Sequence, residues 1–263
     1  KAYRAYMEIS FELIGLLFAV AVLAGTIDTL AGGGGLITIP ALMLSGMSPI
    51  NALGTNKLQG CLGTGTATVL LLRKSKIRLR HIRPLVIGAF LGSALGTVAV
   101  HFVNQKYLTL AVPLVLTFIA VYFILYKPGK AANLGTKVSG KTFTYAVIPG
   151  IGFYDGMFGP GTGSFFTLAN VMLRRAKLIA ATATAKPLNF ATNFSSLIVF
   201  TLYGNVVWQV GLVMMVGQFI GAWTGVDFLY KIDPNKLRLL VVVMCVVMLG
   251  KYLESSGWIK LDW

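Results

Sequence analysis

The chain has 263 residues, of which 56% are apolar and only 12% are charged. Soluble domains contain about 25% charged residues, so this composition excludes an ordinary soluble enzyme or binding module and indicates an integral membrane protein. Two cysteines, both in apolar stretches, exclude a disulfide scaffold, and two histidines argue against a zinc or haem site. The net charge of +15 is carried by basic residues between long apolar stretches. Membrane topology therefore explains this charge better than a nucleic-acid-binding surface does.

Helices are predicted along most of the chain. A helix needs about 20 apolar residues to cross the ~30 Å hydrocarbon core, and seven stretches meet this length: 10–30, 50–72, 84–103, 107–126, 178–202, 209–228 and 237–253. A shorter helix is predicted over 142–157. The stretches 36–48 and 163–173 are too short to cross alone, because about twelve helical residues rise only ~18 Å. Each follows a glycine-rich break, GGGG at 32–35 and GPGTG at 159–163.

The loops between these helices differ in charge. Basic residues crowd the loops at 73–83, 127–141 and 174–177, whereas the loops at 45–50 and 203–208 contain no Lys or Arg. Because basic loops stay in the cytoplasm, we expect the first group inside and the second group outside. Counting crossings from these loops makes 10–48 and 141–173 two hairpins that each begin and end on one side. Both termini are then expected outside.

The two halves of the chain resemble each other. Residues 28–34 align with 155–161, and 52–57 align with 181–186, at nearly the same separation. Three glycines at four-residue spacing also align between the halves: Gly88, Gly92 and Gly96 with Gly217, Gly221 and Gly225. Small residues at this spacing allow close helix packing in lipid.

The aligned halves have opposite predicted orientation, since one connecting loop is basic and its counterpart is neutral. The sequence therefore predicts an all-α integral membrane fold of two inverted-topology repeats. Each repeat contains a glycine-broken hairpin, of one long and one short helix, and three spanning helices. The first repeat covers 1–126, a cytoplasmic linker covers 127–140, and the second repeat covers 141–263. Transporters built this way hold their solute near mid-membrane at the repeat interface.

Two lysines lie deep in predicted spanning helices. Lys57 is about 9 Å of helix rise from its helix start, and Lys186 lies at the equivalent depth in the other half. A lysine at the centre of a membrane costs about 2.5–3.5 kcal/mol, so each needs an anion, an acidic partner or a water-filled cavity. The short helices would aim positive N-terminal ends at the same region. Together these groups predict a pocket for an anion.

Asp28 and Asp155 directly precede the two glycine breaks. Each carboxylate is expected either to accept hydrogen bonds from loop N–H groups or to pair with a lysine, and a role in proton coupling is the alternative. Hydroxyl and amide side chains nearby are as well suited to helix–helix hydrogen bonds as to solute contact. The candidate substrate-binding residues are Lys57, Lys186, Asn56, Thr55, Thr184, Gly33, Gly34, Gly35, Gly161, Thr162, Gly163, Asn189 and Asn193.

Residues 24–58 and 152–165, which contain both glycine breaks, resemble the TauE/SafE family of membrane transporters. The resemblance extends over essentially the whole chain and includes both Thr-x-Lys motifs, at Thr55–Lys57 and Thr184–Lys186. It implies a multi-pass protein of the bacterial inner membrane that exports or exchanges sulfite, sulfonates, sulfoacetate or related sulfur anions. The GGGG run is typical of a broad branch of this family with poorly defined substrates.

The first hypothesis is therefore a secondary transporter, most simply an exporter, for a small oxyanion or organosulfonate, with protons as a candidate coupling ion. An anion channel is the alternative within membrane transport. An intramembrane enzyme using Asp28 and Asp155 is a weaker alternative, because each aspartate lies near a lysine and a glycine break. No cofactor is expected, the lipid bilayer is the expected surrounding, and an oligomer is left open.

Overall fold

The computed structural model describes residues 11–74, 77, 79–104 and 138–229, with scattered residues at 106–121 and 239–254. The described residues form helices and no strand, as predicted. The elements are α1 (Phe11–Ala31), α2 (Gly35–Leu44), α3 (Pro49–Arg73), α4 (Leu79–His101), α7 (Gly140–Thr142), η1 (Phe143–Val147), α8 (Ile148–Met157), α9 (Thr162–Arg174), α10 (Leu178–Leu202) and α11 (Trp208–Phe228). The predicted helices at 107–126 and 237–253 lie mostly outside the described residues.

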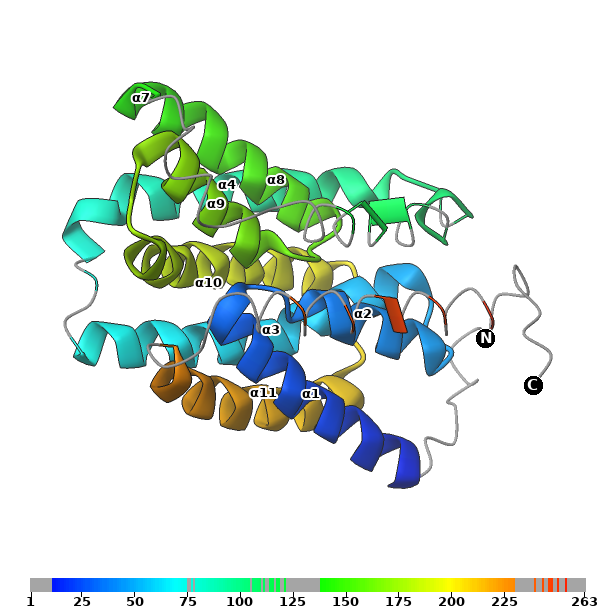
Figure 1. Ribbon diagram of the computed structural model, residues 1–263. Coiled ribbons are helices and arrows are strands. Elements are labelled where there is room, and N and C mark those ends of the chain that lie inside the picture. The colour runs from blue at the N-terminus through cyan, green and yellow to red at the C-terminus, as the bar shows by residue number, and fades with distance from the viewer. Residues whose placement is uncertain are drawn as a thin grey trace.

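Helices α3 and α10 form the centre of the bundle and run in opposite directions (Figure 1). Each has 25 residues, a length of about 37 Å. α11 covers α3 and α4 covers α10, while α1 packs on α11 and α8 packs on α4. The central pair is therefore screened on both sides by other helices.

The outer helices are more apolar than the central pair. Within the described residues, α1, α4 and α11 are long and apolar enough to cross a membrane. They expose large apolar side chains, such as Leu23, Leu91 and Phe219, as surfaces in contact with lipid do. Helices α3 and α10 are long enough but bury threonine, asparagine and lysine side chains.

Both glycine breaks lie where the sequence predicts them. Gly32 has φ 77° and Gly159 has φ 91°, a backbone conformation that glycine adopts without steric cost. The helices that follow, α2 and α9, have 10 and 13 residues. These rise about 15 and 20 Å, so neither crosses a membrane by itself, as expected. α2 ends earlier than predicted because the chain turns at Ser45 and Gly46, where φ is 89°.

The two breaks contact each other across the centre of the bundle. The N–H of Ser164 donates to the carbonyl of Gly32 at 3.4 Å, and the Ser164 hydroxyl donates to the carbonyl of Ala31. A Cβ on Gly163 would lie 2.6 Å from the Cα of Gly32, so only small residues fit at this contact. Segments about 130 residues apart in sequence thus meet at one point.

The predicted packing role of the glycine triplets is confirmed. A Cβ on Gly221 would overlap the Val22 carbonyl of α1, and a Cβ on Gly92 would overlap the Pro149 carbonyl of α8. These glycines therefore set the close approach of α11 to α1 and of α4 to α8.

The basic residues of the described loops gather at one end of the bundle. The α3–α4 and α9–α10 connections lie at one end, and the α2–α3 and α10–α11 connections lie at the other (Figure 1). Among the described residues, the two connections at the first end carry Arg73, Lys74, Arg174, Arg175 and Lys177, and Arg80 and Arg83 follow in the first turns of α4. The 45–48 and 203–207 connections carry none.

Candidate functional site

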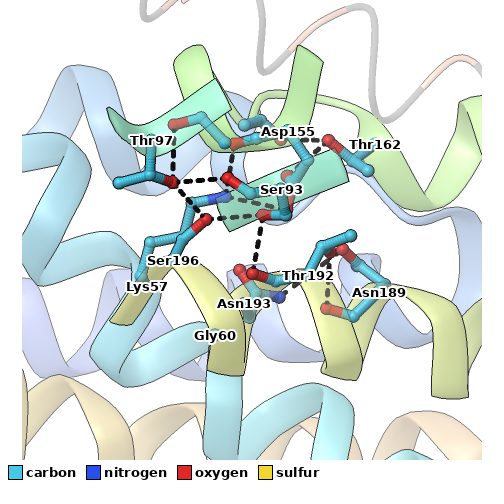
Figure 2. Close-up of polar contacts among 12 residues, drawn as sticks. Lys57, Gly60, Ser93, Thr97, Asp155, Thr162, Asn189, Thr192, Asn193 and Ser196 are labelled. Carbon is cyan, nitrogen blue, oxygen red and sulfur yellow. Dashed lines mark hydrogen bonds and ion pairs between the residues drawn. The ribbon is translucent and has the colours of Figure 1, made fainter. Parts of the chain in front are cut away.

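Lys57 forms a buried ion pair with an aspartate of the other half of the chain. Its Nζ lies 2.8 Å from Oδ2 of Asp155 and donates to the Asp155 carbonyl at 2.6 Å. The lysine comes from the first half of α3 and the aspartate from the last turn of α8, and Figure 2 shows the two side chains facing each other. Only 1% of the Lys57 surface is exposed. This contact satisfies a charge that would otherwise be costly to bury.

Lys186 forms the equivalent ion pair from the second half of the chain to the first. Its Nζ lies 3.6 Å from Oδ2 of Asp28 and donates to the Asp28 carbonyl oxygen. The lysine belongs to α10, in the second half, and Asp28 belongs to α1, in the first half. Each buried lysine is thus paired with the aspartate at the glycine break of the other half.

The second oxygen of each carboxylate binds its own glycine break. Oδ1 of Asp28 accepts the Gly34 N–H at 3.2 Å, and Oδ1 of Asp155 accepts the Thr162 hydroxyl at 2.6 Å. Asp28 therefore forms both interactions that the sequence offered, a lysine pair and a hydrogen bond from a loop N–H, whereas Asp155 pairs with a lysine and binds its break through the Thr162 hydroxyl. Each aspartate holds a helix break and compensates a lysine.

A polar cavity lies between the two breaks and the central helices. It measures about 20 Å³, counting the space open to the centre of a water molecule, which is enough for about one or two waters. Its walls come from both halves of the chain and are almost entirely polar or glycine: Asp28, Gly32, Gly34, Gly35, Asn56, Gly60, Thr64, Asp155, Gly159, Thr162, Asn189, Asn193 and Gln218.

Eight of the residues singled out in the sequence line this cavity: Asp28, Asp155, Gly34, Gly35, Asn56, Thr162, Asn189 and Asn193. Three glycines, Gly33, Gly161 and Gly163, do not line it. Gly161 is the N-cap of α9, and Gly163 packs against Gly32.

Four other candidate residues do not line the cavity, because their polar atoms are already bonded to other protein groups. Thr55 accepts the Val207 N–H at 3.0 Å, and Thr184 donates to the Ala180 carbonyl of its own helix at 2.9 Å. Lys57 and Lys186 do not line the cavity, since their ammonium groups are engaged by the aspartates. The lysines therefore add no net positive charge to the cavity in this arrangement, which corrects the expectation of a lysine-lined pocket.

The sequence reading left out five lining residues: Gly32, Gly60, Thr64, Gly159 and Gln218. Two of them are glycines of the breaks that were identified as motif positions. Gly60 and Thr64 lie one and two turns after Asn56 on α3, so helical periodicity alone could have placed them on the same face. Gln218 had a weaker signal, as one of two glutamines in an otherwise mostly apolar helix.

A cluster of hydroxyls lies directly behind Asp155. Ser93 and Thr97 of α4 both hydrogen bond with Ser196 of α10, at 2.6 and 2.7 Å, and Thr97 also donates to the Gly156 carbonyl at 3.1 Å (Figure 2). These bonds tie α4, α8 and α10 together near the ion pair, and the bond to the Gly156 carbonyl holds the residue that follows Asp155.

The cavity contains amide groups with unused donors. The Asn56 oxygen accepts the Thr38 hydroxyl at 2.6 Å and the Gln59 amide at 3.2 Å. In the part of the chain that the structure describes, no protein group accepts from the NH₂ groups of Asn56 or Asn189. An amide whose oxygen is held and whose NH₂ group is unused is suited to binding an oxygen of a solute.

Comparison with known proteins identifies the family. The model of the sulfite exporter TauE/SafE family matches residues 17–252. The chain belongs to this family. It is also 41% identical over 252 residues to a probable membrane transporter protein of Haemophilus influenzae, covering 96% of this chain and 99% of that protein. No solved structure matches.

Two further relatives carry similar names. The probable membrane transporter protein YfcA of Escherichia coli K12 is 40% identical over 264 residues, covering 100% of this chain and 98% of that protein. The probable membrane transporter protein ORF9 of a Sinorhizobium species is 39% identical over 241 residues, or 92% of each chain. This TauE/SafE protein is therefore a membrane transporter and not an enzyme. Its surroundings are the lipid bilayer, and its substrate is a small molecule.

Proposed function

We propose that this TauE/SafE protein exports a small anion, such as sulfite, sulfoacetate or another organosulfonate or sulfur oxyanion, by alternating access. The observation that carries the proposal is the polar cavity where the two glycine breaks meet. Its unused donors are amide N–H groups, and the positive ends of α2 and α9 lie beside it. Neutral donors of this kind bind oxyanions by hydrogen bonds.

The two halves act as inverted repeats in this proposal, with the boundaries predicted from the sequence. Three features support this. Lys57 pairs with Asp155 and Lys186 pairs with Asp28, so the ion pairs are exchanged between equivalent positions. Helix α1 packs on α11 as α8 packs on α4, through the aligned glycine triplets. Equivalent connections lie at opposite ends of the bundle (Figure 1).

The small size of the cavity favours alternating access over an open pore. A space of about 20 Å³ does not admit a solute as large as sulfoacetate, so the walls have to separate for a solute to enter. The walls belong to both halves, and the two glycine breaks among them touch backbone to backbone, at Gly32 and Gly163. Movement of one half against the other would open the cavity to one side at a time.

The same proposal assigns the basic end of the bundle to the cytoplasm and the neutral end to the outside of a bacterial inner membrane. Protons are the candidate coupling ion, because Asp28 and Asp155 border the cavity. Direct contact of Lys57 or Lys186 with the anion requires that the ammonium group leave its aspartate. That exchange is part of the proposal and is tested below.

Counterflow in liposomes separates a transporter from a channel. Proteoliposomes loaded with unlabelled sulfite are expected to take up radiolabelled sulfite faster than unloaded proteoliposomes, because a transporter exchanges solute across its two states. Uptake should also saturate with concentration. Protein-free liposomes are the control. Flux that does not saturate, shows no stimulation by internal solute and appears as a conductance would contradict the transporter and assign a channel.

A further inference from the structure

Gln218 is a buried amide that the protein itself leaves without a partner. It lies on α11, is 3% exposed and borders the polar cavity. In the part of the chain that the structure describes, no hydrogen bond is formed by either end of its side chain, although the other buried polar residues of α3 and α10 form many. Burying an amide without a hydrogen bond is unfavourable. Its retention at this position needs a reason.

Two glycines make room for this side chain. A Cβ on Gly25 of α1 would lie 2.9 Å from Oε1 of Gln218, and a Cβ on Gly63 of α3 would lie 2.7 Å from the same atom. The Gln218 oxygen therefore rests against two helix backbones, where only Cα–H groups are available as weak partners. This places the carbonyl end between α1 and α3, and from this position we infer that the NH₂ end is the group that can donate into the cavity.

The equivalent position in the other half lacks this group. The glycine triplets align Gly217 with Gly88, so Gln218 corresponds to Ala89 of α4, which is fully buried and apolar. Alanine is sufficient for helix packing at the aligned position, so packing alone does not require a glutamine in α11. The amide is thus an addition in one half only, on the side of the cavity that α11 forms.

We propose that Gln218 is a solute-binding residue, whose Nε2–H donates to an oxygen of the transported oxyanion. The inference rests on the proposed function and extends it, because it names the group that α11 contributes. Asn56 and Asn189 supply donors from α3 and α10, and Gln218 supplies a donor from a third helix. These three amides recognise the oxygen atoms of a compact oxyanion by hydrogen bonds.

Two substitutions at one position test this. Gln218→Met keeps the length of the side chain and removes its hydrogen-bonding groups, and Gln218→Glu keeps the shape and replaces the donor with a negative charge. Gln209→Glu is the matched control, because Gln209 lies on the same helix at an exposed position. The measurement is binding of sulfite and sulfoacetate to detergent-purified protein by calorimetric titration. The thermal midpoint of the ligand-free protein is recorded in parallel.

We expect the Kd of the better-bound anion to rise at least tenfold in Gln218→Met and further in Gln218→Glu, while Gln209→Glu keeps the value of the unsubstituted protein. The midpoint of ligand-free Gln218→Met should be unchanged or higher, since an unpaired buried amide is removed. A structural role would instead lower this midpoint, and that result would overturn the inference.

The failure of the inference differs from the failure of the proposed function. If the unsubstituted protein binds the anions and both Gln218 variants bind them equally well, Gln218 is not a solute-binding residue, and the proposed function stands. If the unsubstituted protein binds neither anion, the choice of sulfur anions as substrate is wrong, and the role given to Gln218 falls with it.

Discussion

At the scale of single residues, the two buried lysines are costly groups to place inside this protein. Taking an ammonium group and a carboxylate out of water costs several kcal/mol per ion, and their mutual attraction repays this only with good geometry. The Lys57 ammonium has that geometry, with one contact to the Asp155 carboxylate and one to the Asp155 carbonyl. Removing one charged partner should therefore lower the free energy of unfolding more than removing both partners does.

Substitution of Lys57 tests this directly. Lys57→Met leaves the Asp155 carboxylate buried and unpaired, and should lower the free energy of unfolding by about 3–5 kcal/mol. The double variant Lys57→Met with Asp155→Asn removes both charges, keeps an acceptor for the Thr162 hydroxyl and should recover most of this loss. Thermal unfolding in detergent measures the effect. Equal destabilisation by the single and double variants would contradict the importance of the ion pair.

The exposed pair between Lys74 and Asp227 is the matched control. The Lys74 Nζ and the Asp227 Oδ1 are 2.7 Å apart, about as close as the atoms of the buried pair, but the two side chains are 42% and 64% exposed. Solvent screens such pairs, which contribute about 0–1 kcal/mol, so Lys74→Met should change the midpoint little. Transport by the recovered double variant then decides the role of Lys57. Unchanged transport would show that the ammonium group does not bind the anion.

The sequence predicts a candidate site residue where burying that one residue in a membrane is energetically costly by itself. A lysine in the middle of an apolar helix and an aspartate beside a glycine break are visible without coordinates. The exchange of partners between halves was not, because Lys57 and Asp155 are 98 residues apart in sequence and only the packing of the two halves brings them together. Gln218 was missed for the same reason, since its neighbours Gly25 and Gly63 lie on other helices.

At the scale of helices, the spacing of small residues decides which pairs pack closely. On α8, Gly152 faces α4, where a Cβ would lie 2.5 Å from the Ala89 carbonyl, whereas Gly150 has nothing within 4 Å of an added Cβ. The same helix therefore offers a tight and an open glycine two residues apart. The backbone carbonyl at the tight position cannot move aside as a flexible side chain would.

Alanine substitutions at these two positions should have opposite effects. Gly152→Ala pushes α8 away from α4 and should destabilise the protein by about 1–3 kcal/mol, the usual range for overpacking. Gly150→Ala should be neutral or stabilising by up to about 1 kcal/mol, because alanine favours a helix over glycine. The midpoints of thermal unfolding of the two variants give the comparison. Equal midpoints would mean that the approach of α8 to α4 is not limited by Gly152.

Helix positions followed well from the sequence, because long apolar stretches and glycine breaks are local signals. Helix α10 has the bounds 178–202 that were expected, and α11 begins one residue earlier than predicted. Helix α4 begins at Leu79, five residues before the expected start, because Arg80 and Arg83 are included in its first turns. Charged residues mark the end of a membrane span but do not end a helix.

At the scale of the whole molecule, polarity is arranged from the inside outward. The central helices α3 and α10 carry the polar groups, and helices with apolar outer faces surround them. Hydropathy alone therefore selects only α1, α4 and α11 among the described helices. The repeat in the sequence, which aligns both lysines and both glycine breaks, is what indicates that the less apolar pair belongs at the centre.

The orientation of this arrangement in the membrane gives the last prediction. Single cysteines at Tyr203 and Lys177, in a chain with Cys61 and Cys245 replaced by alanine, mark the two ends of α10. A maleimide that does not cross membranes should label Tyr203→Cys in intact cells from which the outer membrane has been removed, because the neutral end faces outward. Lys177→Cys should react only after lysis. Labelling in the reverse order would place the basic end outside and contradict the assignment of sides, whereas labelling of both before lysis would contradict a membrane-spanning α10.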